Sequence, residues 1–326
     1  MDVEEIVALS VKHNVSDLHL CSDSPPRWRR TGRLEPAPFP SPDVGALLKA
    51  WLNDEQQGIW WASGQVDFAA TVARGQRLRG SAFKQMRGVS VTLRLLPRTC
   101  PQLASLGAPR VIPELLTNES GLILVTGATG SGKSTTLAAM VDFLNHHTDG
   151  HILTLEDPVE FIYQSERCLI QQREIGQHSP SFADALRSAL RQDPDVILLG
   201  ELRDSETIRL ALTAAETGHL VLATLHTRGA SQAIERLVDT FPAQEKDPVR
   251  NQLAGSLRAV LAQKLVPDLQ DGRVALYELL VNTAAAANLI REGKTWQLPG
   301  IIQTGQQAGM QNFDQSLAER RAQGRL

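Results

Sequence analysis

Residues Gly121 to Ser134 read GLILVTGATGSGKS. The apolar run Leu122 to Thr126 is typical of a buried strand, and Gly127 to Ser134 match the pattern G-x-x-x-x-G-K-[ST] in full. A helix-forming stretch follows. Glycines let successive backbone N–H groups approach phosphate oxygens at the N-terminus of a helix, which adds positive potential. The stretch therefore predicts a nucleotide-binding domain built around a phosphate loop.

The residues of this loop have expected tasks. Lys133 is expected to reach the β- and γ-phosphates of ATP, and the Ser134 hydroxyl to ligate Mg²⁺. A chance glycine-rich turn is the alternative, and the order of strand, loop and helix argues against it. The predicted nucleotide-binding residues are Gly127, Ala128, Thr129, Gly130, Ser131, Gly132, Lys133, Ser134 and Thr135.

Further apolar strands surround the loop in the sequence. They lie at 151–157, 195–201 and 218–226, and helical stretches such as 134–145 and 182–191 separate them. The alternation of strands and helices predicts an α/β domain with a mainly parallel sheet covered by helices on both faces. After Phe241 we expect a mostly helical chain. The domain is predicted to span 115–326.

The first 98 residues read as a small α+β domain. A strand is expected at 17–20, a turn at Pro25 and Pro26, and a helix over 44–61. Period-2 patterns between glycines predict antiparallel strands, at 66–73, 76–83 and 89–96. Prolines at 97, 101, 109 and 113 remove backbone donors and restrict the preceding residues, so 99–114 is predicted to be a linker.

Two acidic residues are candidates for the chemistry. Glu201 ends the apolar run DVILLGE, and ligands bind at the carboxyl ends of parallel strands. It is expected to hold the Mg²⁺ water shell or to polarise the attacking water; a solvated strand-end acid is the alternative. Glu160 lies in LEDPVEF, where three carboxylates within five residues repel one another and need a cation or a dedicated site. A general base and a plain acidic turn fit this segment equally well.

Histidines and arginines form a second group of candidates. His219 and His226 bracket LVLATL, and their odd spacing prevents both from facing one side of a regular strand. Only the terminal position of His226 favours a γ-phosphate sensor over a packed residue. Arg79 and Arg94 lie in strand patterns of the small domain, where a solvated sheet face is the simpler interpretation. An arginine from another domain or subunit would stabilise a phosphoryl transition state.

Bulk properties exclude several classes. The net charge is −3 and the pI about 6.3, which gives no electrostatic argument for a nucleic-acid partner. Three separated cysteines without a C-x-x-C pair disfavour a structural zinc site. The acidic N-terminus does not resemble a signal peptide, and no apolar run approaches the length of a membrane span. We expect a cytoplasmic protein that reaches the membrane only through a partner.

Several motifs together resemble the type II/IV secretion ATPases, and within them the PilT-like motors of type IV pilus retraction. The similarity covers almost the whole chain, and its long central block is very specific. The motifs are VSDLHL (15–20), GATGSGKSTT (127–136), TLEDPVEF (154–161), QREIG (172–176) and the block from Ala185 to Thr227.

The resemblance implies roles for the candidates above. Glu160 matches the catalytic glutamate of the family's aspartate box, and Glu201 matches its Walker B glutamate. His219 and His226 match the His-box pair, and Arg79 and Arg94 match small-domain arginines that approach the nucleotide. The family also implies a PAS-like N-terminal domain, a RecA-like ATPase domain, a homo-hexameric ring and an inner-membrane platform protein as partner.

One segment departs from the retraction branch. The family motif AIRNLIRE reads AAANLIRE here, with Ala286 and Ala287 replacing an isoleucine and an arginine. The long N-terminal extension and four-cysteine zinc loop of assembly and type II secretion ATPases are absent from this sequence, which favours the retraction branch. The altered pair keeps a second hypothesis open, a ring-forming scaffold or regulator with slow turnover. A secretion or conjugation-type transport ATPase is a third, disfavoured by the acidic pI.

Overall fold

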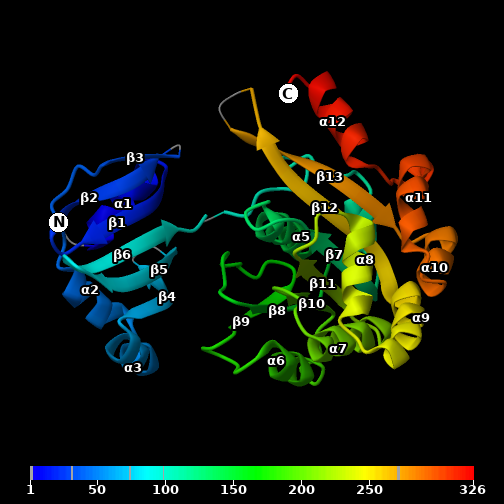
Figure 1. Ribbon diagram of the computed structural model, residues 1–326, viewed down its shortest axis with the longest axis horizontal. Helices are drawn as coiled ribbons and strands as arrows, with labels where there is room; N and C mark the ends of the chain where they lie inside the picture. Colours follow the sequence, from blue (N-terminus) through cyan, green and yellow to red (C-terminus); the bar gives the residue numbers. More distant parts are fainter. Residues whose placement is uncertain (1–2, 31, 73–74, 98, 270–271) are drawn as a thin grey trace. The chain divides into compact units, whose positions relative to one another are not determined.

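The computed structural model describes residues 3–30, 32–72, 75–97, 99–269 and 272–326. The chain divides into two units. The first unit comprises Met1–Thr99 together with Glu160–Ile162, and the second comprises Cys100–Val159 and Tyr163–Leu326. In Figure 1 the first unit is mainly blue to cyan and the second runs from green to red.

The first unit is an antiparallel sheet in the order β3-β2-β1-β6-β5-β4, packed with three helices. Its core consists of alternate strand residues such as Leu18, Ala82 and Leu93, together with Val44 and Trp60 from the helices. The predicted antiparallel strands are confirmed; Ala73, the last residue of one of them, lies outside the described residues. The elements are α1 (Val3–Lys12), β1 (Val15–Cys21), β2 (Ser24–Arg30), β3 (Arg33–Pro36), α2 (Val44–Trp51), α3 (Asp54–Ser63), β4 (Gln65–Val72), β5 (Gln76–Gln85) and β6 (Gly88–Leu95).

Two predictions for this unit were wrong in detail. The prolines expected in a turn belong to β2, near whose start a missing backbone donor is tolerated. The single helix expected over 44–61 is two helices, because Asn53 starts a new one. Its side-chain oxygen accepts a hydrogen bond from the Gln56 backbone N–H at 2.8 Å, and the Gln56 side chain accepts one from the Asn53 N–H at 3.1 Å.

The second unit is built on a seven-stranded sheet in the order β13-β12-β7-β11-β10-β8-β9. All neighbouring pairs are parallel except β12 and β13, which are antiparallel. The predicted mainly parallel sheet is therefore confirmed. The elements are α4 (Ile112–Leu116), β7 (Gly121–Thr126), α5 (Lys133–His147), β8 (His151–Glu156), β9 (Leu169–Glu174), α6 (Phe182–Ala189), β10 (Val196–Leu199), α7 (Ser205–Glu216), β11 (Leu220–Leu225), α8 (Ala230–Asp239), α9 (Lys246–Ser256), β12 (Leu257–Pro267), β13 (Arg273–Val281), α10 (Ala284–Arg291), α11 (Leu298–Thr304) and α12 (Phe313–Ala322), with 3₁₀ turns η2 (Ala243–Glu245), η3 (Thr295–Gln297) and η4 (Gln306–Ala308).

After Phe241 the chain contains helices α9 to α12, as expected, but the prediction missed β12 and β13, which form a long hairpin in the sheet. Leu257, Val260, Leu261 and Leu265 recur at helical spacing, so the apolar pattern alone did not exclude a helix. Pairing decides the outcome, since β12 lies between β7 and β13 and is buried over most of its length.

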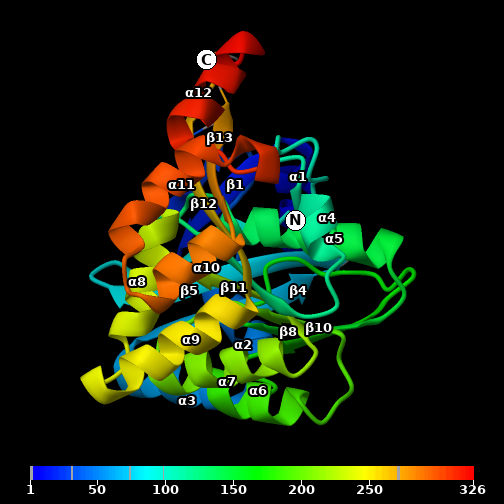
Figure 2. The same cartoon turned by 90° about the vertical axis from the view of Figure 1, so that its right-hand side faces the viewer.

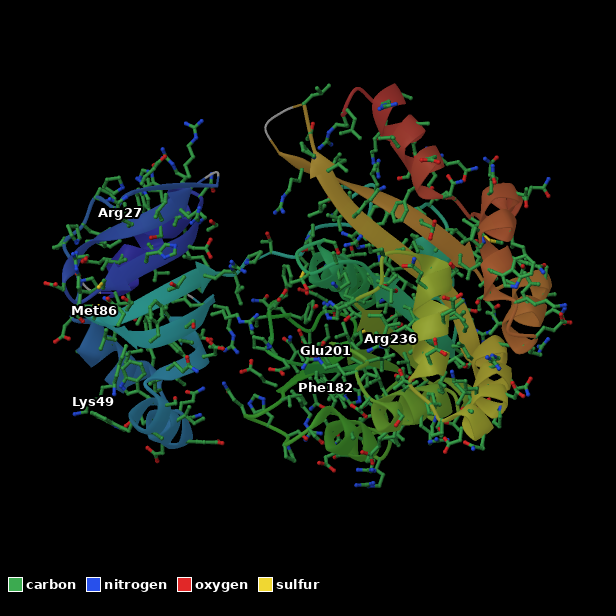
Figure 3. The ribbon with its side chains drawn as sticks, viewed as in Figure 1. Arg27, Lys49, Met86, Phe182, Glu201 and Arg236 are labelled. Atoms are coloured by element: carbon green, nitrogen blue, oxygen red, sulfur yellow. The ribbon has the colours of Figure 1, made fainter. Side chains whose placement is uncertain are left out.

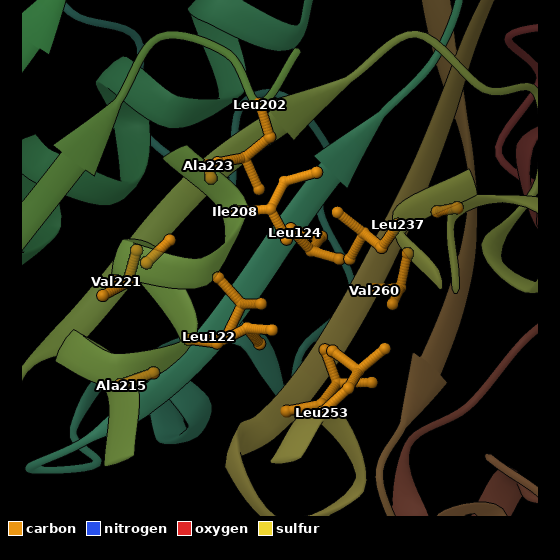
Figure 4. Close-up of a cluster of buried hydrophobic side chains, with 14 of the residues drawn as sticks. Leu122, Leu124, Leu202, Ile208, Ala215, Val221, Ala223, Leu237, Leu253 and Val260 are labelled. Atoms are coloured by element: carbon orange, nitrogen blue, oxygen red, sulfur yellow. The ribbon is translucent and has the colours of Figure 1, made fainter. Parts of the chain in front are cut away.

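Strand β7 separates two apolar cores because its side chains alternate between the faces of the sheet. Leu122 and Leu124 point into a cluster with α6 to α11, part of which Figure 4 shows. Ile123 and Val125 point into a second cluster with α4 and α5. Figure 2 shows α8 and α9 on one side of the sheet and α4 and α5 on the other. Among the described residues, no helix has the length and hydropathy to cross a membrane.

Candidate nucleotide-binding site

Parallel pairing brings the predicted site residues to one edge of the second unit's sheet. The phosphate loop follows β7, His226 follows β11 and Glu201 follows β10, and these three strands are neighbours. The carboxyl ends of parallel strands in an open α/β sheet form the usual ligand-binding edge. Residues that are far apart in the sequence therefore meet at a place suited to ligand binding.

The phosphate loop closes around its own lysine. Lys133, the first residue of α5, is only 8% exposed, and its Nζ donates to the carbonyl oxygens of Gly127 at 2.9 Å and Ala128 at 3.0 Å. Gly127 has a φ of +156°, and a Cβ there would lie 2.4 Å from Ser131 Oγ. Gly132 has a φ of +88°, and a Cβ there would lie 2.7 Å from Gln263 Nε2. Glycine is required at both positions to bring the backbone this close.

The loop fits a phosphate-bearing ligand. Residues 128–130 and Ser134 are exposed, and Thr135 is half-buried, whereas the Ser131 Oγ is buried without a hydrogen-bond partner among the described residues. The loop leads into the N-terminus of the fifteen-residue helix α5, where backbone N–H groups attract anions. Ser134 lies in the first turn of this helix, and its role as a Mg²⁺ ligand stays a prediction.

Glu201 is held between two basic side chains. Its Oε1 lies 2.6 Å from Arg203 Nη2, and its Oε2 lies 3.3 Å from His226 Nε2. The Glu201 side chain is 11% exposed, whereas those of His226 and Arg203 are 51% and 71% exposed. Figure 3 labels Glu201 among the side chains of the second unit. The structure thus joins Glu201 to His226 and adds Arg203, whose only sequence signal was its position two residues beyond the candidate acid.

A pair of threonines fixes the strand end beside His226. The Thr126 and Thr227 hydroxyl oxygens are 2.7 Å apart, and the Thr227 backbone N–H donates to Thr126 Oγ1 at 3.0 Å. Thr126 is the last residue of β7 and Thr227 directly follows His226. These bonds hold the segment that bears His226 against the strand that leads into the phosphate loop.

The LEDPVEF segment is held from β9. The Val159 backbone N–H donates to Oε2 of the buried Glu174 at 3.0 Å, and Glu156 Oε1 accepts from Thr154 Oγ1 at 2.7 Å. Glu160 is half-buried and belongs to the first unit, so its approach to the phosphate loop stays a prediction. Sequence reasoning missed Glu174, because nothing in QREIG marks an acid that turns back to an earlier loop.

His219 lies at the opposite edge of the sheet from the phosphate loop. It precedes β11, its carbonyl accepts from the Gly121 N–H at the start of β7, and its Nδ1 lies 3.1 Å from the Ala214 carbonyl oxygen. The six residues of β11 separate it from His226 by about 20 Å. The structure therefore does not bring His219 together with the phosphate loop of the same chain.

The two predicted arginines are cross-strand neighbours in the first unit. Arg79 of β5 pairs with Arg94 of β6, and both side chains are exposed. Arg94 Nε donates to Asp17 Oδ1 at 2.9 Å, and Asp17, from the VSDLHL motif, is 7% exposed. The ion pair fixes the direction of Arg94, while the approach of either arginine to a nucleotide stays a prediction.

A cavity of about 620 Å³ adjoins the start of α5. Gly132, Thr135 and Thr136 line one side of it, and Gln263 and Tyr277 of the β12–β13 hairpin line another. The Tyr277 hydroxyl is buried there, and burial raises its pKa. The volume is within the usual range of small-molecule sites.

Comparison with known proteins agrees with this geometry. Residues 64–325 match the family described as type II/IV secretion system protein. The chain is 73% identical to the uncharacterized protein YggR of Escherichia coli K12, over the full length of both. It is 48% identical to the type IV pilus retraction ATPase PilT of Pseudomonas aeruginosa, over 97% of this chain and 93% of the relative.

A crystal structure of the pilus retraction motor PilT with bound ADP shares the fold. It matches with a TM-score of 0.92 and 41% identity, covering 100% of this chain and 94% of that one. The agreement includes an N-terminal antiparallel sheet and a second, mostly parallel sheet. The chain belongs to the type II/IV secretion system protein family and is PilT-like.

Proposed function

We propose that this protein hydrolyses ATP to ADP and phosphate at the phosphate loop of its second unit. The observation that supports this most directly is the meeting of Lys133, Glu201 and His226 at one edge of the sheet. Hydrolysis needs a positive charge beside the phosphates and a carboxylate that helps to hold Mg²⁺. Lys133 and Glu201 would supply these two groups at this edge of the sheet. The PilT relative, which is named an ATPase, covers nearly the whole chain.

The loop residues bind and orient the phosphates in this proposal. Lys133 turns its ammonium from the loop carbonyls to the β- and γ-phosphates, and the loop N–H groups bind the remaining oxygens. Ser134 and Glu201 are the residues that would hold Mg²⁺, which when bound neutralises charge on the phosphate oxygens. His226, whose Nε2 lies 3.3 Å from Glu201 Oε2, is proposed to sense the γ-phosphate.

Water activation and transition-state charge fall to residues of the first unit. Glu160 is the proposed general base, which accepts the proton of the attacking water. Arg79 and Arg94 are proposed to approach the nucleotide, from the same chain or a neighbour, and to stabilise the charge that develops on the transferred phosphoryl group. In this proposal the first unit is PAS-like and the second is RecA-like.

At the level of the assembly, we propose a cytoplasmic homo-hexameric motor of the pilus retraction type. It would act through an inner-membrane platform protein on a pilus or a related envelope machine. The support is similarity to PilT over 97% of the chain, together with the division of the chain into two units.

A scaffold with slow turnover is the second candidate, and α10 motivates it. Ala286 is fully buried and Ala287 is 7% exposed, so both pack into the core of the second unit where the retraction motif has an isoleucine and an arginine. The larger side chains would change this packing or the surface next to it.

Phosphate release from MgATP separates the two candidates. A motor is expected to turn over ATP and to accelerate when the cytoplasmic domain of a platform protein from the same cell is added. ATP-dependent ring formation with turnover that the platform domain leaves unchanged would support the scaffold.

A further inference from the structure

Gln263, in the middle of β12, lies directly behind the phosphate loop. Its side chain is buried, with 3% of the residue exposed, and both ends of its amide are used. The Nε2 donates to the Ser131 carbonyl oxygen at 2.7 Å, and the Oε1 accepts from the Thr136 hydroxyl at 2.6 Å. Thr136 is fully buried in the first turn of α5. The side-chain amide of this β12 residue thus links the phosphate loop to helix α5.

This contact determines which way a loop peptide faces. The carbonyl of Ser131 and the N–H of Gly132 belong to one planar trans peptide, so they point in opposite directions. Because the carbonyl is turned towards the Gln263 side chain, the Gly132 N–H is turned away from that side chain. The N–H groups of a phosphate loop must point inward to bind phosphate oxygens.

Gln263 also limits the space around the loop, through its side chain and its backbone. A Cβ on Gly132 would lie 2.7 Å from Gln263 Nε2, and a Cβ on Gly127 would lie 2.4 Å from the Gln263 backbone oxygen. The loop therefore lies against Gln263 at two glycines.

We propose that Gln263 is a positioning residue for nucleotide binding. It holds the Ser131–Gly132 peptide in the orientation that offers its N–H to a phosphate, and the Thr136 hydroxyl holds Gln263 in turn. This inference rests on the proposed nucleotide site. Only a group with one donor and one acceptor satisfies both partners, and the neutral amide of glutamine is such a group.

Glutamate has nearly the same size as glutamine, so the variant Gln263→Glu tests the hydrogen bonds of the amide separately from side-chain volume. In Gln263→Glu the ionised carboxylate only accepts hydrogen bonds, so it repels the Ser131 carbonyl. The protonated acid has one donor and one acceptor and can replace the amide. Burial favours the neutral form and raises the pKa of such a glutamate. The defect of the variant is therefore present above this pKa and is relieved as the pH falls through it.

The measurement is calorimetric titration of the full chain with MgADP between pH 5.5 and 8, expressed as the ratio of variant to wild-type Kd. We expect Gln263→Glu to bind about tenfold more weakly at pH 8, the effect of one buried unsatisfied hydrogen bond. The ratio should return towards one at pH 5.5. Gln263→Leu should bind more weakly at every pH. Gln57→Glu, which alters an amide bonded to the Leu52 carbonyl between α2 and α3, is the matched control and should bind like wild type.

A second pair of variants covers the case in which Gln263→Glu does not fold. Thr136→Val removes the hydroxyl that orients Gln263 and should weaken MgADP binding, whereas Thr136→Ser keeps the hydroxyl and should restore it. Wild-type affinity in folded Gln263→Glu at pH 8, or in Thr136→Val, would overturn the positioning role. So would a Glu variant whose defect does not change with pH. Failure of the wild-type protein itself to bind MgADP would instead reject the proposed nucleotide site.

Discussion

At the scale of single residues, local and distant information differ in what the sequence reveals. The phosphate loop could be predicted because all residues of its motif are neighbours in the sequence, so that their relative positions follow from the local backbone. The contacts of Glu201 with Arg203 and His226 could not be predicted from spacing, because His226 reaches Glu201 only after strands β10 and β11 have paired. His219 illustrates the opposite case. It is close to His226 in the sequence, but the two lie at opposite ends of strand β11.

Both candidate carboxylates are expected to be needed for ATP turnover and not for ATP binding. Glu201→Gln and Glu160→Gln should each reduce ATP turnover by about 10²–10⁴-fold, the usual effect of losing one positioned base, with nearly unchanged ATP binding. The amide keeps the size of the side chain and removes its charge. Fluorescent-nucleotide affinity and steady-state phosphate release measure the two effects. Joint loss of binding and turnover in Glu160→Gln would indicate a structural role for that residue, and normal turnover in the same variant would remove Glu160 as the base.

The two histidines provide a matched pair at opposite edges of one sheet. His226→Ala should reduce turnover at least about tenfold, because it removes a partner of Glu201 beside the phosphate loop. His219→Ala should leave turnover within about twofold of wild type, because His219 lies at the other end of β11 from the phosphate loop of its own chain. Steady-state phosphate release on both variants is the measurement. Equal losses in the two variants would refute an assignment based on the sheet edge.

At the scale of elements, apolar runs between glycines predicted the central strands well, whereas the β12–β13 hairpin was mistaken for helix. The reason is that LRAVLAQKLVP has apolar residues compatible with both periods, and only the partners β7 and β13 decide between them. The break between α2 and α3 was missed for a local reason. The capping pair Asn53 and Gln56 was present in the sequence but lay inside a continuous helical pattern.

Strand β7 is expected to contribute strongly to the stability of the second unit. Leu124 is fully buried in the larger apolar cluster, so Leu124→Ala should lower the free energy of unfolding by about 2–5 kcal/mol. Leu169→Ala is the control, because that side chain is 54% exposed on β9 and its loss should cost about 0.5 kcal/mol or less. Urea unfolding followed by circular dichroism compares them. Similar costs for both would contradict the assigned core.

At the scale of the whole molecule, the family and the general architecture were recognisable from the motifs, but the assembly was not. Neither motif spacing nor the fold of one chain contains the rotation between neighbours that closes a ring. Heterologous contacts form a ring only when that rotation closes. The hexamer therefore stays a prediction that rests on the PilT-like relationship.

Assembly can be measured on the wild-type chain. With saturating MgATP the protein should form a hexamer, detected as a sixfold mass by light scattering coupled to size exclusion. The Lys133→Ala variant is a useful comparison, because weakened nucleotide binding should shift the mass towards smaller species. A monodisperse wild-type monomer at high protein concentration with MgATP would be inconsistent with a ring motor.

The central claim is that the loop from Gly127 to Ser134 hydrolyses ATP, and steady-state phosphate release by wild type and Lys133→Ala tests it most directly. Lys133 supplies the point charge for the β- and γ-phosphates, and its alanine variant keeps the helix that follows. We expect measurable Mg²⁺-dependent turnover in the wild type and a loss to background in a folded Lys133→Ala. Equal turnover in the two proteins would contradict it.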